Sequence, residues 1–429
     1  MPTKRAIDRL LIWTQQRIKA KHLMEERLTK LLHNFPYSIN FKIIKIAGTN
    51  GKGSVSAMLS SCLTSDNQSV GMFTSPHLVN VTERFRVNDQ EINEAELEIL
   101  ATEVEAWLFD FVQIHGTQFT PTFFDVLILI AIAFFEKNKV AIAIFEAGVG
   151  GSNDATSYLP DTVSAITSIG LDHVAQLGNT LESVAKDKAG IAQSNSTLIL
   201  SSSINDPLKE VIKKEIISKN ITLVSTKNRR VSSSFSLEEP GFSYLIDQKT
   251  IQLQPSLKGH FQLRNLDLVI EIWRFLLSKK IVHRLESLQA VRATKWNARF
   301  EIIKKNPTWI FDAAHNEHAL KALIISLDQM SNIEDRVLIL GISKEKDAKK
   351  MLPIARQISK TVFLVDDFYK STNNEVLINL ASNIDFEQLE STKILKVINE
   401  VSQVFSKKII VVTGSIFMIG QARNQLLNE

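Results

Sequence analysis

The sequence predicts an α/β protein of two domains, each built around a mostly parallel sheet. Short apolar runs that stop at glycine or polar clusters alternate with longer stretches of helical spacing, which is the pattern of strand–helix–strand units. The chain of 429 residues is too long for one ordinary core, and 44% hydrophobic residues supply enough apolar material for two. We therefore expect parallel strands joined by helical crossovers.

Five apolar runs are expected to form the first sheet. They are Lys42–Ala47, Val70–Phe73, Val140–Phe145, Val163–Ile169 and Thr197–Leu200. The longest apolar run, Val126–Phe135, is bounded by acidic residues and is about half as long as a bilayer span. We expect it to be a buried helix, and we expect no membrane partner.

A second set of strands predicts a smaller, Rossmann-like α/β domain. Its members are Thr308–Phe311, Arg336–Leu340, Thr361–Val365 and Ile409–Val412. Between the two sets, residues 222–256 are richer in Ser, Thr and Gln and predict an antiparallel excursion attached to the first domain. We predict an ATP-binding domain over residues 1–295 and a second domain over residues 296–429.

Charge and cysteine content exclude some classes of function. Lys and Arg outnumber Asp and Glu by 50 to 46, and this surplus is spread along the chain, which argues against a nucleic-acid partner. The single cysteine, Cys62, rules out an intramolecular disulfide, and the N-terminal segment has no apolar signal-peptide core. We expect a monomeric cytoplasmic enzyme whose ligands are small anions such as nucleotides and polycarboxylates.

The first strand is followed by a candidate phosphate-binding loop. The loop reads Gly48-Thr49-Asn50-Gly51-Lys52-Gly53-Ser54 and opens a helix. Glycines let successive N–H groups turn toward phosphate oxygens, the helix N-terminus adds partial positive charge, and Lys52 adds a full one. The generic P-loop pattern is not strictly met, because Ile46 and Gly53 stand where Gly and Ser or Thr are usual. A plain strand-to-helix turn is the alternative, but strand, Gly-Lys pair and helix together favour nucleotide binding.

Three further candidates follow predicted strands, where open α/β sheets place their ligands. Ser75, Glu146 and His173 carry a hydroxyl, a carboxylate and an imidazole. Such groups can hold Mg²⁺ or Mn²⁺ that also takes ATP phosphate oxygens. Each residue alone has a simpler interpretation, as a turn former, a strand-end cap or a solvated loop residue. Their shared position at strand ends favours a site.

The loop with glycine after its lysine resembles that of the folylpolyglutamate and dihydrofolate synthases, within the Mur ligase superfamily. Further segments resemble this family in the same order along the chain: Ser75–Leu78, Glu83–Asn88, Lys186–Ile191, Gly259–Asn265, Arg299–Glu301, Asp312–Ala319 and Gly414–Gly420. The resemblance implies a P-loop ATPase domain of the Mur ligase type. It also implies an ATP-dependent ligase that adds L-glutamate to a folate, to dihydropteroate or to both, through an acyl phosphate.

The resemblance assigns roles to individual residues. Lys52, Lys188 and His315 would be catalytic, and Lys188 would be carbamylated by carbon dioxide to serve a second Mg²⁺ ion. Residues implied to bind ATP are Asn50, Gly51, Lys52, Gly53, Ser54, Asn265, Arg299 and Asp312. Those implied to hold metal are Ser75, Glu146, His173 and Lys188, and those implied to bind substrate are His77, Asp154 and Ser415. Without the resemblance, Lys188 would be interpreted as a surface helix residue.

Departures from the family pattern leave other functions open. Ser152 and Ser157 replace an Arg and an Asn of the family, while Ala313 and Glu317 replace a Gly and a Pro. The alternatives are another amino-acid ligase of the superfamily and a nucleotide-binding paralogue without catalysis. The cell-wall ligases carry a uridine-nucleotide-binding domain before the loop, for which the 47 residues before Gly48 are too few.

Overall fold

A computed structural model describes residues 5–15, 23–234, 241–304 and 306–428. The chain divides into two compact units. The first contains residues 1–169, 182–227 and 268–288, and the second contains residues 170–181, 228–267 and 289–429. Each unit is described separately below.

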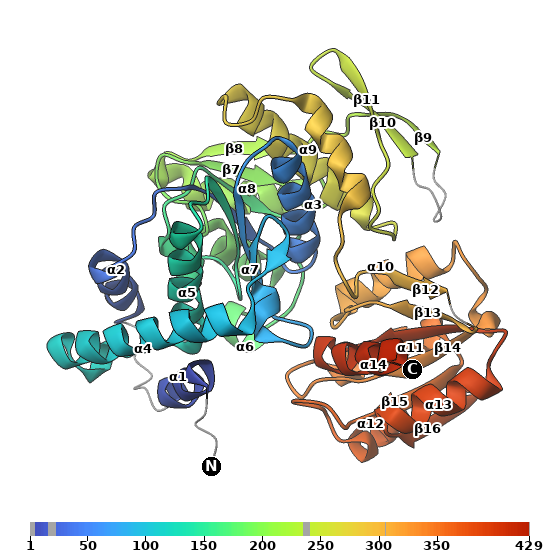
Figure 1. The fold of residues 1–429 in the computed structure, drawn as a ribbon. Helices are drawn as coiled ribbons and strands as arrows, with labels where there is room; N and C mark the ends of the chain where they lie inside the picture. The colour runs from blue at the N-terminus through green and yellow to red at the C-terminus, as the bar shows by residue number, and fades with distance from the viewer. Residues whose placement is uncertain (1–4, 16–22, 235–240, 305, 429) are drawn as a thin grey trace. The chain divides into compact units, whose positions relative to one another are not determined.

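The first unit is built on an eight-stranded sheet in the order β4-β3-β2-β5-β1-β6-β7-β8. Its strands β7 and β8 are labelled in Figure 1. Strands β2, β5, β1, β6, β7 and β8 run parallel to one another, and β3 and β4 add an antiparallel edge beside β2. In sheet order the strands are Gln90–Glu91, Phe85–Val87, Val70–Phe73, Ile142–Glu146, Lys42–Ala47, Val163–Ile166, Thr197–Leu200 and Thr222–Ser225. All five predicted strands are confirmed, with shifts of one to three residues at two of them.

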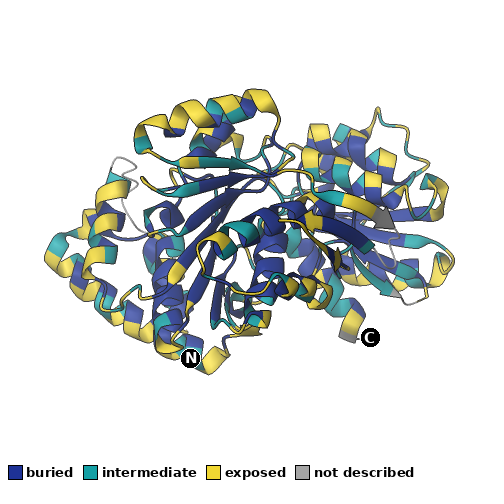
Figure 2. Cartoon of the chain, turned by 90° about the horizontal axis from the view of Figure 1, so that it is seen from above, coloured by how far each residue is buried: buried dark blue, intermediate teal, exposed yellow. Residues whose placement is uncertain are grey.

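Helices cover this sheet because their apolar faces need a partner. The helices are α1 (Ala6–Gln15), α2 (Met24–Asn34), α3 (Lys52–Ser65), α4 (Glu94–His115), α5 (Phe123–Lys137), α7 (Leu181–Ala189) and α8 (Asp206–Ile216). One core cluster joins α1, α4 and α5 to the sheet, and another joins α7 and α8 to it. Figure 2 shows the buried strands in dark blue and exposed outer helix faces in yellow. The apolar run at 126–135 is the buried helix that we predicted, within α5.

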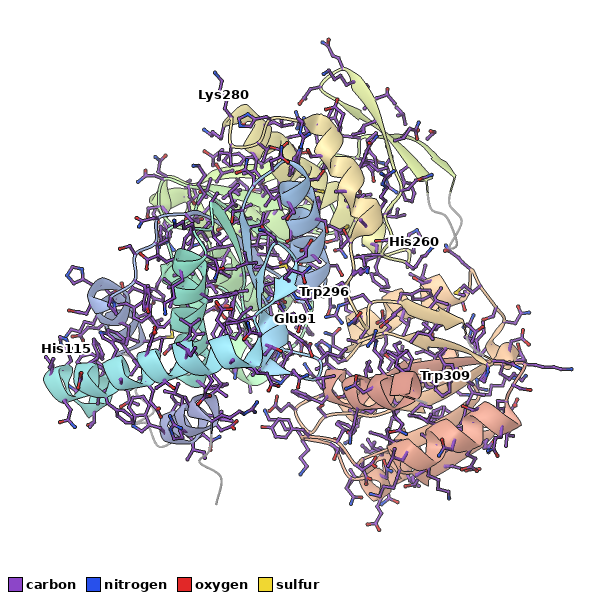
Figure 3. All side chains as sticks on the ribbon, viewed as in Figure 1. Glu91, His115, His260, Lys280, Trp296 and Trp309 are labelled. Carbon is purple, nitrogen blue, oxygen red and sulfur yellow. The ribbon has the colours of Figure 1, made fainter. Side chains whose placement is uncertain are left out.

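The second unit has a six-stranded sheet in the order β12-β13-β17-β14-β15-β16. It is parallel except for the edge pair β12 and β13. In sheet order the strands are Glu301–Lys304, Thr308–Phe311, Ile409–Thr413, Arg336–Leu340, Thr361–Val365 and Gln388–Thr392. Trp309, labelled in Figure 3, is buried on β13 and its ring stacks on that of Phe311, with centroids 6.1 Å apart. The predicted second α/β fold is confirmed.

Five helices accompany this sheet: α10 (Glu317–Leu327), α11 (Ala348–Ile358), α12 (Asn374–Ala381), α13 (Ile394–Val404) and α14 (Ile416–Asn428). Helices α10, α11 and α12 pack side by side, and α13 packs against α14 (Figure 1). The core combines leucines and isoleucines of α10 and α11 with the inward faces of β13, β14 and β15.

A small antiparallel sheet of three strands also belongs to the second unit. It consists of β9 (Arg230–Ser234), β10 (Gly241–Ile246) and β11 (Lys249–Leu253). The predicted antiparallel excursion is thus present, but it groups with the second unit rather than with the first. A long-range hydrogen bond from His260 N to Ser326 Oγ, 2.9 Å, ties the following loop to α10. The helix α9 (Gln262–Ser278) then leads back into the first unit. The predicted boundary at 295/296 stays a prediction.

Candidate active site

The phosphate-binding loop lies between β1 and α3 in the first unit. Gly48 and Gly51 have φ angles of +148° and +89°, which side chains rarely adopt. A Cβ atom at Gly48 would lie 1.9 Å from Thr167 Oγ1, so no larger residue fits there. The hydroxyls of Thr167 and Ser168 donate to the carbonyl of Asn50 at 2.6 and 3.0 Å. The end of β6 therefore fixes the loop in place.

Lys52, Glu146 and Ser75 meet at this loop. Lys52 is the first residue of α3, and its ammonium donates to Gly48 O at 3.1 Å. The Glu146 carboxylate at the end of β5 lies 3.9 Å from the same ammonium. It also accepts from Ser75 N at 3.3 Å. The structure thus brings together a cation that follows β1, a carboxylate at the end of β5 and a serine that follows β2.

The donor chemistry of this group fits a magnesium ion. Mg²⁺ binds through one or two carboxylates together with hydroxyl, water and phosphate oxygens. Glu146 and Ser75 supply oxygens of those kinds beside the loop. Among the described residues, no three His, Cys, Asp or Glu side chains gather as a metal site. A metal held here would therefore depend on oxygens from its phosphate ligand as well.

The loop after β2 contains His77, which we predicted to bind substrate. Burial, and then the charge of Arg84, lower the pKa of His77 to about 4. Arg84 Nε donates to His77 Nδ1 at 3.0 Å, which orients a neutral ring. The Glu83 carboxylate accepts from three successive backbone N–H groups of residues 78–80, at 2.6 to 2.7 Å. The family-like segment at residues 83–88 therefore holds the loop that carries His77.

Lys188 lies in the last turn of α7 and is only 2% exposed. The alternative of a surface helix residue is therefore wrong. Its neighbour Asp187 accepts from Gly151 N at 2.8 Å and from Ser152 Oγ at 2.6 Å. A Cβ atom at Gly151 would meet the Lys188 carbonyl oxygen at 2.7 Å. The loop after β5 is thus packed closely on the turn that carries Lys188.

Asp154 is buried within that same loop. Its carboxylate accepts from Val149 N at 2.9 Å and from both the N–H and the hydroxyl of Thr156, at 3.0 and 2.6 Å. Burial raises the pKa of Asp154, while these hydrogen bonds oppose the shift. The contacts show a residue that holds the loop together, and direct contact with substrate stays a prediction.

In the second unit, the carboxylate of Asp172 gathers three side chains. Lys346 Nζ lies 2.5 Å from Oδ1, while Asn316 Nδ2 and His315 Nε2 lie 3.0 and 3.4 Å from Oδ2. Burial opposes ionisation of Asp172, but the hydrogen bond with His315 and the charge of Lys346 outweigh it. The pKa of Asp172 is therefore far below its usual value. His315 Nδ1 lies 2.8 Å from Ala313 O.

His173 follows this aspartate and also belongs to the second unit. Its backbone has a φ of +49°, and its N–H donates to Asp172 Oδ1 at 2.9 Å. The imidazole remains one-third exposed. Convergence of His173 with Ser75 and Glu146 on one metal, as the sequence suggested, stays a prediction.

Asp312, Arg299 and Asn265 were predicted to bind ATP. Asp312 is buried after β13 and accepts from Phe300 N and Ala314 N at 2.8 and 2.9 Å. Burial raises the pKa of Asp312 to about 6, although the charge of Arg299 works in the opposite direction. The Asn265 amide donates to Gln262 Oε1 at 2.8 Å in the first turn of α9.

Ser415 lies where β17 ends and α14 begins. It is 1% exposed, and its hydroxyl is 3.0 Å from that of Ser343, in the loop that follows β14. Gly414 has a φ of +105°, and a Cβ atom there would come within 2.4 Å of Gly341 O. This close approach of two strand-end loops fixes the position of Ser415.

The chain matches two known domain families over most of its length. The Mur ligase middle domain matches residues 46–272, and the glutamate ligase domain of Mur ligases matches residues 298–416. The chain belongs to the Mur ligase family. The two matches cover most of the two large sheets and all of the predicted site residues.

Two curated relatives narrow the position within the Mur ligases. A dihydrofolate synthase/folylpolyglutamate synthase of Bacillus subtilis is 29% identical over 392 residues, which cover 89% of each chain. A probable bifunctional folylpolyglutamate synthase/dihydropteroate synthase of Haloferax volcanii is 26% identical over 89% of this chain. The chain spans only 45% of the length of that second relative. The resemblance to folylpolyglutamate and dihydrofolate synthases that the motifs carried is confirmed.

Two solved structures of this branch of the Mur ligases have the same fold. A folylpolyglutamate synthase of Thermotoga maritima is 26% identical, with a TM-score of 0.81 and coverage of 98% of this chain and 97% of that one. The Escherichia coli FolC protein in complex with DHPP and ADP is 23% identical, with a TM-score of 0.80 and 99% coverage of both chains. The second likeness shows the fold alone.

Some residues of this Mur ligase site were missed by sequence reasoning. Asp187, Lys346 and Ser343 were not singled out, and Asp172 was noted only as the neighbour of His173. Asp172 and Lys346 are 174 positions apart, so no local pattern could pair them. The departure at Ser152 has a partner in the fold, because its hydroxyl binds Asp187. No helix in the described part of the chain is both long and apolar enough to cross a membrane.

Proposed function

We propose that the protein is an ATP-dependent ligase that joins the amino group of L-glutamate to the carboxylate of a folate, of dihydropteroate or of both. The observation that carries this proposal is the phosphate loop with Lys52 Nζ 3.9 Å from the Glu146 carboxylate, on a chain that matches both Mur ligase domains. Relatives named as folylpolyglutamate and dihydrofolate synthases support the substrates. ATP is supported by solved relatives in complex with ADP.

In the first step, the pteroate or folate carboxylate attacks the γ-phosphorus of ATP and ADP leaves. The N–H groups of Gly51, Gly53 and Ser54 would bind phosphate oxygens at the positive end of α3. Asn50 would line the same loop, with its own N–H donating to Ser168 Oγ at 2.9 Å. Lys52 offsets the charge that spreads over the transferring group. Its ammonium would exchange the Gly48 carbonyl for a phosphate oxygen, a small movement of one side chain.

Ser75, Glu146 and His173 are the residues that would hold Mg²⁺, which Mn²⁺ could replace. The ion would supply further positive charge to the phosphate oxygens. Lys188 would serve a second ion after carbamylation, in which its neutral amine attacks carbon dioxide and releases a proton. The burial of Lys188 supports this, because a carbamate changes the residue from a buried cation to an oxygen ligand.

In the second step, the amine of glutamate attacks the acyl phosphate and phosphate leaves, which gives an amide. His315 and Ser415 of the second unit would bind and orient the glutamate, and Asn265, Arg299 and Asp312 would contact the nucleotide. The partly exposed ring of His315 supports its contact with a ligand. His77 would contact the pteroate or folate, and Asp154 would shape the neighbouring loop. We also propose that the enzyme acts as a cytoplasmic monomer.

A purified-enzyme assay tests the proposal. The protein is given ATP, Mg²⁺, bicarbonate and L-glutamate, with dihydropteroate or tetrahydrofolate in separate reactions. We expect ADP release that requires both glutamate and the pterin substrate, and an amide product in the mass spectrum. Activity with one substrate assigns the synthase type. ADP binding without turnover of either substrate would favour the catalytically inactive alternative.

A further inference from the structure

The side chains around Asp172 form a group whose parts come from three separate segments of the second unit. Asp172 lies in residues 170–181, Lys346 lies in the loop between β14 and α11, and His315 and Asn316 lie just before α10. The Asp172 carboxylate oxygens lie 2.5 Å from Lys346 Nζ, 3.0 Å from Asn316 Nδ2 and 3.4 Å from His315 Nε2. We call Asp172, His315, Asn316 and Lys346 the Asp172 cluster.

Exposure differs within the Asp172 cluster. The side chain of Asp172 is 8% exposed and that of Lys346 is 11% exposed, whereas 31% of His315 is open to solvent. A ligand can therefore reach His315, while the carboxylate behind it is covered by its own partners. Asp172 must act through its neighbours rather than on the ligand.

The ring of His315 is held from both sides. Nδ1 faces the carbonyl oxygen of Ala313 at 2.8 Å, and Nε2 faces Asp172 Oδ2 at 3.4 Å. Asn316, the next residue, is also fixed, because its amide donates to Asp172 and its Oδ1 accepts from Ala319 N to cap α10. Without the Asp172 carboxylate, the His315 ring would keep only its contact with Ala313 O, and Lys346 would lose a close anionic partner.

We propose that Asp172 is a positioning residue for the amino-acid substrate, because its carboxylate holds both the His315 ring and the Lys346 ammonium in place. This inference rests on the proposed function. The Lys346 ammonium carries three N–H donors and directs one of them at Asp172, and the His315 ring is partly exposed, so the cluster has cationic and hydrogen-bonding groups for an anionic ligand. Such groups suit a substrate that carries two carboxylates of its own.

The test compares Asp172→Asn with the wild type in the glutamate-dependent assay. The amide keeps the size of the side chain but removes the charge that holds Lys346 and His315. We expect the KM for glutamate to rise about tenfold or more, as loss of a charge-assisted hydrogen bond implies. The KM for ATP should stay within about twofold, while the Tm should fall, because the amide leaves the largely buried Lys346 ammonium without its anionic partner. Asp172→Glu, which restores a carboxylate, should recover part of the loss.

The matched control is Asp347→Asn, which makes the same chemical change one residue after Lys346. Asp347 is more than half exposed and caps α11 through Lys350 N, a role that asparagine also fills. This control should leave every kinetic constant unchanged. The double variant Asp172→Asn/Lys346→Gln should be no worse than the poorer single variant, because both changes break the same contact.

Ring nitrogen chemical shifts of ¹⁵N-labelled histidine give a readout that needs no turnover. The His315 signals should move in Asp172→Asn and stay in Asp347→Asn. Unchanged shifts together with an unchanged KM for glutamate would overturn the positioning role. An equal loss for ATP and glutamate, not recovered in Asp172→Glu, would make Asp172 structural and would also overturn it. A wild type without glutamate-dependent turnover contradicts the proposed function first, and the inference fails with it.

Discussion

At the residue scale, the Lys52 ammonium faces two oxygen acceptors, the Gly48 carbonyl at 3.1 Å and the Glu146 carboxylate at 3.9 Å. Neither contact fixes the loop, since the hydroxyls of Thr167 and Ser168 do that. We therefore expect Lys52→Ala to keep the fold but to lower kcat by about 10²- to 10³-fold, the usual effect of removing one charge-stabilising group. Steady-state ADP release measures the loss.

The control for this prediction is Lys209→Ala on α8, where the lysine pairs with the exposed Asp206. It removes the same side chain at a distance from the loop, so kcat should not change. A Lys52→Ala variant with wild-type kcat would contradict the role of the loop.

Lys45 is a fully buried cation on β1, the strand that leads into the phosphate loop. It donates to the carbonyls of Ser157 and Leu159 at 3.3 and 3.0 Å and lies 3.7 Å from Asp161. Burial lowers the pKa of Lys45 from 10.5 to about 8, although Asp161 opposes the shift. The protonated form is therefore disfavoured in the fold. The free-energy cost of burying the charged Lys45 is fully present below pH 8 and disappears as the pH rises toward 10.5.

The free energy of unfolding should record this difference. Relative to Lys45→Met, the wild type should gain stability between pH 8 and pH 10.5, by up to about 3 kcal/mol. Urea unfolding of both proteins at several pH values measures it, and the other lysines and tyrosines cancel in the comparison. Two parallel curves of stability against pH would show that Lys45 does not titrate in this range.

At the scale of single elements, α5 depends on a buried ion pair at its N-terminus. Asp125 accepts from Thr122 N at 2.7 Å as part of a capping box and from Arg27 Nε of α2 at 3.1 Å. Both charged side chains are 4% exposed. Arg27→Ala should lower the free energy of unfolding by about 3 to 5 kcal/mol, because it leaves a buried carboxylate without its cation.

Chemical denaturation measures this change, and Lys213→Ala provides the comparison. Lys213 pairs with Glu210 on the surface of α8, where both side chains are 63% exposed. Its loss should cost less than about 1 kcal/mol. If both variants lost the same stability, the buried pair would not anchor α5.

The elements themselves were largely predictable because their signals are local. Strands such as Thr308–Phe311 and Arg336–Leu340 are short apolar runs between polar residues, and the structure has them at the predicted bounds. Edge strands escaped prediction, since β4 has two residues and β16 reads Gln-Leu-Glu-Ser-Thr, with little apolar pattern. They form because a neighbouring strand supplies hydrogen bonds, which no local sequence feature records.

The site residues were likewise predictable where their sequence signal is local, and they were missed where it depends on the tertiary fold. The phosphate loop could be recognised because glycines and a lysine must follow one another there. Ser75 and Glu146 could be placed at strand ends, and the fold brings them within 3.3 Å. Asp172 and Lys346 depend on a contact across 174 positions. Such a pair follows only from the tertiary fold.

At the scale of the whole molecule, the two units do not follow the chain in simple order. Residues 170–181 and 228–267 group with the second unit although they precede it in sequence. Contacts such as those of Asp172 with Asn316 and of His260 with Ser326 account for this. Composition alone predicts a boundary where the strand pattern changes. It does not show that an earlier segment of the chain packs with a later domain.

The boundary at 295/296 can be tested by dissection. Every strand of the six-stranded sheet lies between Glu301 and Thr413, and its core comes almost entirely from the same range. We therefore expect a fragment of residues 296–429 to fold alone, with a cooperative thermal transition and dispersed NMR signals. A fragment that starts at residue 312 lacks β12 and β13, which leaves β17 with an open edge, and it should not fold cooperatively. If residues 296–429 stayed unfolded while residues 228–429 folded, the domain would begin at the small antiparallel sheet instead.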